Sequence, residues 1–251
     1  MKRFYDRLAA QVEGEYFAFM NYGYAEPGRG RYAWLQERDR PNRYHLSLVR
    51  RVLEGVDLCG KSVLEVGCGR GGNCDYLLLY TAASRVTGVD LCAANARLAS
   101  RRCNSASCSF VCGDAQRLPF RDASFDVVLN VESSHCYPSM ERFVNETWRV
   151  LRPSGVFAHT DFWRLAIFEY DWDARERAIR DPRFEWLGEE NISEQVFLAL
   201  KRRDGISTAL RRLRNAENRE LIGNVVRTND ALRYYLASGQ CSYLIRRLRK
   251  R

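Results

Sequence analysis

The amino-acid sequence predicts an α/β protein built on a mainly parallel sheet. Short apolar runs, typical of buried strands, alternate with segments whose apolar residues recur at helical spacing. A cluster of four glycines follows the first apolar run, and the next two runs each end in an acid. Strands and helices that alternate at these lengths form right-handed crossovers, which bring the carboxyl ends of the strands to one edge of the sheet.

The apolar patterns place the elements of this core in order. Strands are expected at 63–66, 85–90, 109–114, 125–131 and 155–162, and helices at 42–55, 73–83, 91–102 and 138–151. Two further helices are predicted at 191–200 and 218–237. The elements divide the chain into an N-terminal arm or cap (1–44), a core (45–162), a helical lid (163–240) and a basic C-terminal segment (241–251).

Composition predicts one domain of upper-middle size. The chain has 251 residues, of which 46% are hydrophobic, so it can bury a large core. No apolar stretch approaches the ~20 residues of a membrane span, and the first residues lack the apolar middle of a signal peptide. We therefore expect a cytoplasmic protein without a membrane partner.

The nine cysteines are odd in number and show no CxxC spacing. Such a pattern encodes neither a zinc site nor a complete disulfide framework. We expect reduced, mostly buried thiols and no bound metal.

The net charge of +9 is concentrated late in the chain. From Trp163 onward there are 19 Lys and Arg against 13 Asp and Glu, with clusters at 201–203, 211–214 and 246–251. Such clusters can bind phosphates, but a solvated helix face and a frayed basic terminus are the commoner explanation. Nucleic acid is therefore an unlikely partner.

The N-terminal arm is rich in aromatic residues and is interrupted by glycine and proline. It either covers the core surface or folds over a ligand, with Tyr22 and Tyr24 as candidate substrate contacts. Phe162 and Trp163, where the last parallel strand ends, are candidates of the same kind on the lid side. An exposed arm can also exchange between subunits, which makes a homo-oligomer an expectation.

Ligands of parallel sheets bind beyond the carboxyl ends of the strands, and several polar residues fall at that edge. Gly67, Gly69 and Gly72 satisfy a GxGxxG pattern that dinucleotide-binding folds share. Asp90 is spaced to take two ribose hydroxyls, and Asp114 lies one strand further, within reach of an adenine amino group. The alternative is that these acids cap the helices that follow.

Five ordered segments resemble the class I methyltransferases that use S-adenosylmethionine (SAM). They are VLEVGCG (63–69), TGVD (87–90), GDAQRLPF (113–120), FDVVLN (125–130) and VLRPSG (150–155). The resemblance implies a Rossmann-like sheet of seven strands, the last antiparallel, with helices on both faces. Residues 241–249 would be the closing strand, followed by the basic tail, and the lid at 163–240 would form the acceptor region. It also implies SAM as cofactor and S-adenosylhomocysteine (SAH) as product, rather than a nicotinamide.

The resemblance assigns roles at the strand ends. Glu65 and the glycines would hold the methionine moiety, Asp90 the ribose, and Asp114 with Ala115 the adenine. The residues it implies for the cofactor site are Glu65, Gly67, Cys68, Gly69, Gly71, Asp90, Leu91, Asp114, Ala115, Asn130 and Ser134.

The segment from Asn130 to Pro138 resembles the branch of small-molecule O-methyltransferases that act on sugar, lipid or polyketide hydroxyls, including the phthiotriol dimycocerosate group. That resemblance implies His135 as general base and Asp161 as its helper. An imidazole is suited to the work because an alcohol must lose a proton as it is methylated, and a positioned base contributes about 10²–10⁴-fold. The alternatives are that His135 forms a pocket wall and that Asp161 caps the next segment.

Three functions remain after the sequence is considered. The first is methyl transfer from SAM to a hydroxyl of a small specialised metabolite. The second is methylation of carbon, or a cyclisation with bound SAM, on the same fold. The third is methylation of nucleic acid or protein with the help of the basic tail.

Overall fold

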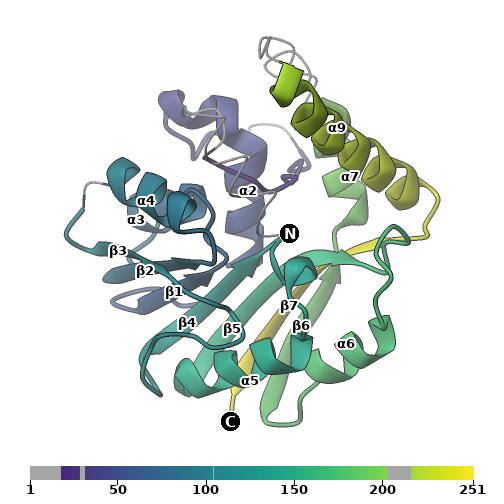
Figure 1. Ribbon diagram of the computed structural model, residues 1–251. Helices are drawn as coiled ribbons and strands as arrows, with labels where there is room; N and C mark the ends of the chain where they lie inside the picture. The colour runs from purple at the N-terminus through teal and green to yellow at the C-terminus, as the bar shows by residue number, and fades with distance from the viewer. Residues whose placement is uncertain (1–17, 29–31, 104, 203–215) are drawn as a thin grey trace.

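The computed structural model describes residues 18–28, 32–103, 105–202 and 216–251, and side chains except those of 216–226. These residues form a seven-stranded sheet in the order β3-β2-β1-β4-β5-β7-β6 (Figure 1). Strands β1 to β5 pair in parallel, and β7 runs antiparallel to both β5 and β6. The strands are β1 (Ser62–Val66), β2 (Arg85–Asp90), β3 (Cys108–Cys112), β4 (Phe125–Val131), β5 (Leu151–Trp163), β6 (Phe184–Asn191) and β7 (Ser242–Lys250).

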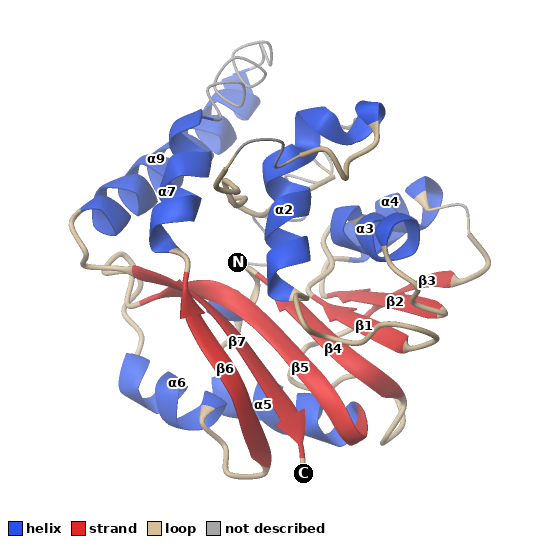
Figure 2. Cartoon of the chain, turned by 180° about the vertical axis from the view of Figure 1, so that it is seen from behind, coloured by secondary structure: helices blue, strands red, loops and turns tan. Residues whose placement is uncertain are grey.

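Helices cover both faces of the sheet (Figure 2). Alternation along β1 explains this, because Val63 packs in one apolar cluster with α2 and α3 while Leu64 and Val66 pack in another with α5. The two clusters form the two layers of the core. The helices are η2 (Glu37–Asn42), α2 (Arg43–Val52), α3 (Gly72–Tyr80), α4 (Ala93–Arg102), η3 (Ser134–Cys136), α5 (Met140–Val150), α6 (Trp172–Ile179), α7 (Ser193–Arg202) and α9 (Ala216–Ala237).

The segment 163–240, expected to form a helical lid, also contains a strand. It contains the helices expected near 191–200 and 218–237, but Phe184–Asn191 forms β6, the edge strand of the sheet. Burial along β6 alternates weakly, and its outward residues include Glu185 and Glu189. A polar edge strand lacks the apolar signal of a buried strand, so its pairing with β7 decides its structure.

The basic C-terminal residues are built into the sheet rather than forming a tail. β7 lies between β5 and β6, and the Arg246 side chain is almost fully buried. Its guanidinium is 2.7 Å from a Glu176 carboxylate oxygen and 2.6 Å from one of Glu189. Lys250 Nζ donates to two backbone carbonyl oxygens at 2.7 Å. These cations are used by the fold itself, whereas residues 203 and 211–214 lie outside the described residues.

The described part of the N-terminal arm crosses the carboxyl edge of the sheet. Gly72 donates its N–H to the Ala18 carbonyl at 3.2 Å, at the start of α3. The Tyr24 N–H donates to Tyr44 at 2.8 Å, and the Ala25 N–H donates to Gln195 on α7 at 3.1 Å. Residues 18–25 therefore span the distance from the glycine-rich turn to α7, while residues 1–17 are outside the described part.

All nine cysteines are free thiols. Within the described ranges, His, Cys, Asp and Glu side chains form no group of three or more that fits a metal ion. Among the same residues, no helix has the length and apolar character that crossing a bilayer requires.

Candidate functional site

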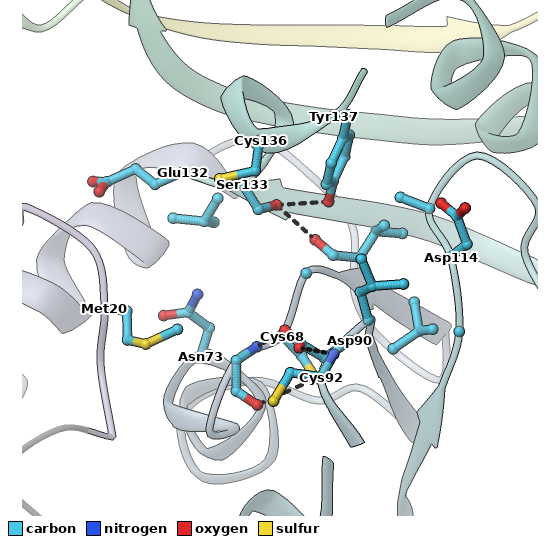
Figure 3. Close-up of a pocket in the computed structure, with 18 of the residues that line it drawn as sticks. Met20, Cys68, Asn73, Asp90, Cys92, Asp114, Glu132, Ser133, Cys136 and Tyr137 are labelled. Atoms are coloured by element: carbon cyan, nitrogen blue, oxygen red, sulfur yellow. Dashed lines mark hydrogen bonds between the residues drawn. The ribbon is translucent and has the colours of Figure 1, made fainter. Parts of the chain in front are cut away.

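A pocket lies beyond the carboxyl ends of β1, β2 and β4, with the arm along one side (Figure 3). Seven of the residues expected at the cofactor site line it: Gly67, Cys68, Gly69, Asp90, Leu91, Asp114 and Ala115. The arm contributes Ala18, Met20 and Asn21. The pocket therefore joins the glycine-rich turn to strand ends that are far apart in the sequence.

The glycine-rich turn has no room for side chains. Gly67 and Gly69 have φ values of +75° and +52°, which favour glycine. A Cβ on Gly67 would lie 2.3 Å from Ser133 Oγ, and one on Gly69 would lie 2.6 Å from Met20 Cε. Both glycines let neighbouring segments approach the turn closely.

The backbone N–H groups of this turn are used inside the protein. Those of Gly67 and Cys68 donate to the Val89 carbonyl at 2.8 and 3.0 Å, and that of Gly69 donates to Asp90 Oδ2 at 2.9 Å. A phosphate cradle needs such donors free to face the ligand. The turn is therefore built for close approach of a ligand rather than for holding a pyrophosphate.

Asp90 and Asp114 lie on the pocket wall at different depths. Asp90 also accepts from the Cys92 N–H at 2.8 Å, so its carboxylate is fixed between the end of β2 and the start of α4. Asp114 is exposed and accepts from the Gln116 N–H at 2.8 Å. Each acid therefore stabilises its own turn while facing the pocket.

Glu65 is not part of the pocket lining. It is buried, and it accepts hydrogen bonds from Asn73 Nδ2 at 2.7 Å and from the Cys74 thiol at 3.0 Å. Burial raises the pKa of Glu65 to about 8. Because Asn73 lines the pocket, Glu65 affects it by fixing that side chain. Gly71, also expected to contact the cofactor, is the N-cap of α3 and lies outside the lining.

Asn130 and Ser134 stand behind the wall. Asn130 Nδ2 donates to the Val66 carbonyl at 2.9 Å and to Ser133 Oγ at 2.8 Å. Ser134 Oγ donates to Asp161 at 2.7 Å. Ser133 and Tyr137, which the sequence did not single out for the cofactor site, line the pocket instead.

His135 and Asp161 are brought together, as expected for a catalytic pair. Their Nδ1 and Oδ1 atoms are 2.9 Å apart, and the His135 N–H donates to Asp161 Oδ2 at 3.0 Å. The register explains this, because β4 pairs with β5 through Val131 and Thr160, which places Asp161 beside the turn after β4.

Charge and burial oppose each other in this pair. Burial alone would lower the pKa of His135, but the Asp161 carboxylate and Cys136 outweigh it and raise that pKa well above its usual value. Burial would raise the pKa of Asp161, but His135 and other hydrogen bonds hold it below its usual value. His159, by contrast, has its pKa lowered to about 3 by burial and is neutral.

An aromatic wall lies against His135. The His135 ring is 4.5 Å from that of Phe162 and 5.8 Å from that of Phe168, centroid to centroid. The Tyr170 hydroxyl donates to the His135 carbonyl at 2.6 Å. His135 itself is not in the pocket lining, but its neighbour Cys136 is.

The four expected substrate contacts lie outside the pocket lining and are spread around it. Phe162 packs on His135, whereas the ring of Trp163 packs on Trp172 with the Arg246 guanidinium above it. Tyr22 and Tyr24 belong to the arm. Tyr22 contacts the site through its N–H, which donates to Glu132 Oε1 at 2.6 Å.

Glu132 is a lining residue that the sequence reasoning missed. It directly follows β4, has a φ of +49°, and is only 8% exposed. Oε1 also accepts from the Tyr243 hydroxyl, while Oε2 is buried and, in the part of the chain that the structure describes, has no hydrogen-bond partner. Burial raises the pKa of Glu132 to about 8. Glu132 lies within the segment from Asn130 to Pro138 that resembles the O-methyltransferases, and this position was the signal that could have identified it as a site residue.

Comparison with known proteins gives a family. Residues 64–159 match the family described as a methyltransferase domain. The chain is 39% identical over 223 residues to a fatty-acid O-methyltransferase of Mycolicibacterium smegmatis, covering 88% of this chain and 79% of that protein. It is also 39% identical over 215 residues to a phthiotriol/phenolphthiotriol dimycocerosates methyltransferase of Mycobacterium tuberculosis, covering 83% and 77%.

Solved structures share the fold at low sequence identity. The geranyl diphosphate C-methyltransferase of Streptomyces coelicolor, whose complex contains SAH, matches with a TM-score of 0.75, 16% identity and coverage of 100% and 96%. The [4+2]-cyclase SpnF matches with a TM-score of 0.74, 20% identity and coverage of 99% and 95%. At such identities these structures support the fold alone. Taken with the identity to the curated relatives and the pocket at the glycine-rich edge, they place this chain in the family of SAM-dependent class I methyltransferases.

Proposed function

We propose that this enzyme transfers the methyl group of SAM to an oxygen atom, a hydroxyl in the first instance, of a small lipid-like or natural-product acceptor. The observation that carries the proposal is the His135–Asp161 pair, whose Nδ1 and Oδ1 atoms are 2.9 Å apart. The pair lies beside the cofactor pocket, and aromatic side chains pack against His135. Both curated relatives bear names of enzymes that act on lipids, and one is named an O-methyltransferase.

The residues of the pocket fit SAM. Bound SAM supplies a methyl group on a positively charged sulfur that is a good leaving group. We assign Gly67 and Gly69 to the close approach of the methionine part, Asp90 to the ribose, and Asp114 with Ala115 to the adenine. Glu65 acts on the methionine end through Asn73, and Asn130 and Ser134 hold the wall from behind.

We assign His135 as the base that removes the proton from the acceptor hydroxyl. With Nδ1 held by Asp161, the neutral ring carries its hydrogen there and presents Nε2 as the accepting atom. The carboxylate then stabilises the imidazolium that forms. Asp161 raises the pKa of His135, so the pH at which the neutral base becomes abundant is higher than for an ordinary histidine.

The acceptor is assigned to the side of His135 that bears the aromatic wall. Phe162, Phe168 and Tyr170 stack in sequence, with ring centroids 5.3 and 5.4 Å apart. Such a surface suits an apolar chain or ring and excludes water from the reacting oxygen. Tyr22 and Tyr24 would close the opposite side through the arm, and Trp163 would support the wall from beneath.

The test is methyl transfer to two probes, 1-dodecanol and dodecanoic acid, followed by mass spectrometry of the products. We expect an O-methyl ether from the alcohol, an O-methyl ester from the acid, or both. Methyl transfer to neither probe, with no O-methylated product from a wider panel of lipid alcohols and acids, would contradict the proposal.

The second candidate is methylation of carbon or a SAM-dependent cyclisation. It stays open because the same fold and the same cofactor segments serve it, and because the name of the Mycobacterium tuberculosis relative does not state which atom is methylated. A product whose added methyl group survives chemical cleavage of ethers and esters would identify C-methylation. A product of unchanged mass would identify a cyclase.

A further inference from the structure

The carboxyl group of Glu132 lies at the end of the pocket away from Asp114. Figure 3 shows Glu132 on the same rim as Ser133 and Cys136, with Met20 and Asn73 across from it and Asp114 at the far end. If Asp90 and Asp114 take the adenosine part, Glu132 lies toward the methionine and sulfur part. The inference rests on this placement of SAM in the pocket.

Glu132 is held firmly by one oxygen only. Oε1 accepts from the Tyr22 N–H of the arm and from the Tyr243 hydroxyl of β7. Oε2 is buried and has no hydrogen-bond partner among the described residues, and Glu132 has a left-handed backbone conformation that glutamate rarely adopts. Unsatisfied buried polar atoms and strained backbone are both unfavourable, and they gather at ligand sites because a ligand compensates them there.

Within the described ranges, the groups that most shift the pKa of Glu132 include no lysine or arginine. Tyr22 and Tyr243 are donors to Oε1, and Asp161 repels a negative charge on Glu132. His135 attracts such a charge, but it is paired with Asp161. Cys136 and Arg70 also line the pocket. The missing partner of Oε2 is therefore sought in the ligand, and SAM carries a positive sulfonium that SAH lacks.

We propose that Glu132 is the cofactor-facing carboxyl of this pocket, which loses its proton when SAM binds and, as a carboxylate, faces the positive sulfonium. A cation close to a buried acid favours its charged form. Once the methyl group has left, the sulfur is neutral, so Glu132 regains a proton and the attraction is lost. Glu132 thereby favours binding of SAM, whose sulfur is charged, over binding of SAH, whose sulfur is neutral.

Ionised Glu132 also strengthens the hold on the arm. A carboxylate accepts a shorter and stronger hydrogen bond than a neutral carboxyl group, and Oε1 accepts the Tyr22 N–H. Met20 and Asn21, which precede Tyr22, line the pocket. SAM therefore tightens the arm over itself, and SAH does so less.

The experiment is calorimetric titration of SAM and of SAH into the protein without acceptor, in buffers of different ionisation enthalpy. The buffer dependence gives the number of protons released. At pH 7 we expect close to one proton released by SAM and much less by SAH, with the release falling at pH 9, where Glu132 is already ionised. Equal release by both ligands, or none with SAM at pH 7, would overturn the proposal without the use of a variant.

Substituted variants show which residue releases the proton when SAM binds. Glu132→Gln should abolish the release and weaken SAM by about 10-fold while changing SAH binding by less than about twofold. Tyr243→Phe, which keeps the carboxyl group, should retain the release. Glu65 has a similarly raised pKa, so Glu65→Gln is the matched control and should also retain it. Release that persists in Glu132→Gln and disappears in Glu65→Gln would refute the role of Glu132.

The arm provides an independent readout. Hydrogen exchange of a peptide covering residues 18–25 should slow by severalfold when SAM binds the wild-type protein, and less in Glu132→Gln. Equal slowing in both proteins would contradict the link to the arm. If SAM does not bind at all, the placement of the cofactor in this pocket fails, which is distinguishable from SAM binding without proton release.

Discussion

Asp161 accepts hydrogen bonds from both the ring Nδ1 and the backbone N–H of His135, at 2.9 and 3.0 Å, across 26 residues of sequence. One carboxylate thus fixes the orientation of the imidazole and the turn that carries it. The arrangement depends on β4 and β5 being neighbours in the sheet. It makes the role of each residue separable by experiment.

Replacing His135 by alanine should remove the base and leave the cofactor pocket intact, because His135 does not line it. We expect turnover with an alcohol acceptor to fall about 10²–10⁴-fold. SAM affinity measured by calorimetry should stay within about twofold of the wild-type value. Turnover within a few-fold of wild type would rule out His135 as the base.

Asp161→Asn should shift the pH dependence of methyl transfer. In the wild-type protein the rate should rise with pH as His135 loses its proton, and this rise occurs at high pH because Asp161 raises the pKa of His135. Without the carboxylate charge, burial dominates and the rise moves to lower pH. The plateau should also fall, since the imidazolium is less stabilised. An unmoved profile, measured over pH 6–10, would speak against the pair.

Gly67→Ala should damage both folding and cofactor binding. The new methyl group would lie 2.3 Å from Ser133 Oγ, at a φ of +75°. We expect a loss of about 1–3 kcal/mol in the free energy of unfolding and at least about 10-fold weaker SAM binding. Gly188→Ala is the control, since its Cβ would meet no atom within 4 Å and its φ is not left-handed. Equal effects of the two substitutions would contradict the explanation.

Arg246→Ala tests whether the basic C-terminal strand serves the fold. Arg246 is buried between Glu176 and Glu189, and removal of one partner from a buried ion pair costs about 3–5 kcal/mol. Arg249→Ala, in the same strand, breaks a half-exposed pair with Glu185 and should cost less than about 1 kcal/mol. The check is urea denaturation of both variants. A stable Arg246→Ala protein with weakened nucleic-acid binding would favour the phosphate-binding alternative.

The ligand-free protein should become less stable as the pH rises from about 5 to 8. Glu65 and Glu132 have folded-state pKa values of about 8, far above the usual value of 4.5, so the folded state holds more protons than the unfolded chain in this window. Each group contributes a slope of up to about 1.4 kcal/mol per pH unit. Urea midpoints across this range should show the decline. Glu65→Gln should flatten it, and a rise in stability with pH would show that burial does not raise these values.

Local patterns were sufficient for the central part of the chain. The apolar run from Val63 to Val66, its glycines and the acid ending β2 predicted a mainly parallel sheet, which the seven-stranded sheet confirms. The ligand position at the carboxyl edge of that sheet stays a prediction. Patterns were insufficient at the sheet's far edge. β6 exposes Glu185, Leu187 and Glu189, and its identity as a strand depends on β7, which begins more than fifty residues later in the sequence.

The site divides in the same way. Sequence alone determined which kind of cofactor is used, since the five segments that resemble the class I methyltransferases are short and follow one another along the chain. Only the tertiary structure decided that the arm and Glu132 line the same pocket and that Arg246 is buried. Those relationships join residues such as Tyr22, Glu132 and Tyr243, which lie more than a hundred residues apart. No local pattern encodes them, because burial and pairing between distant segments exist only once the chain has folded.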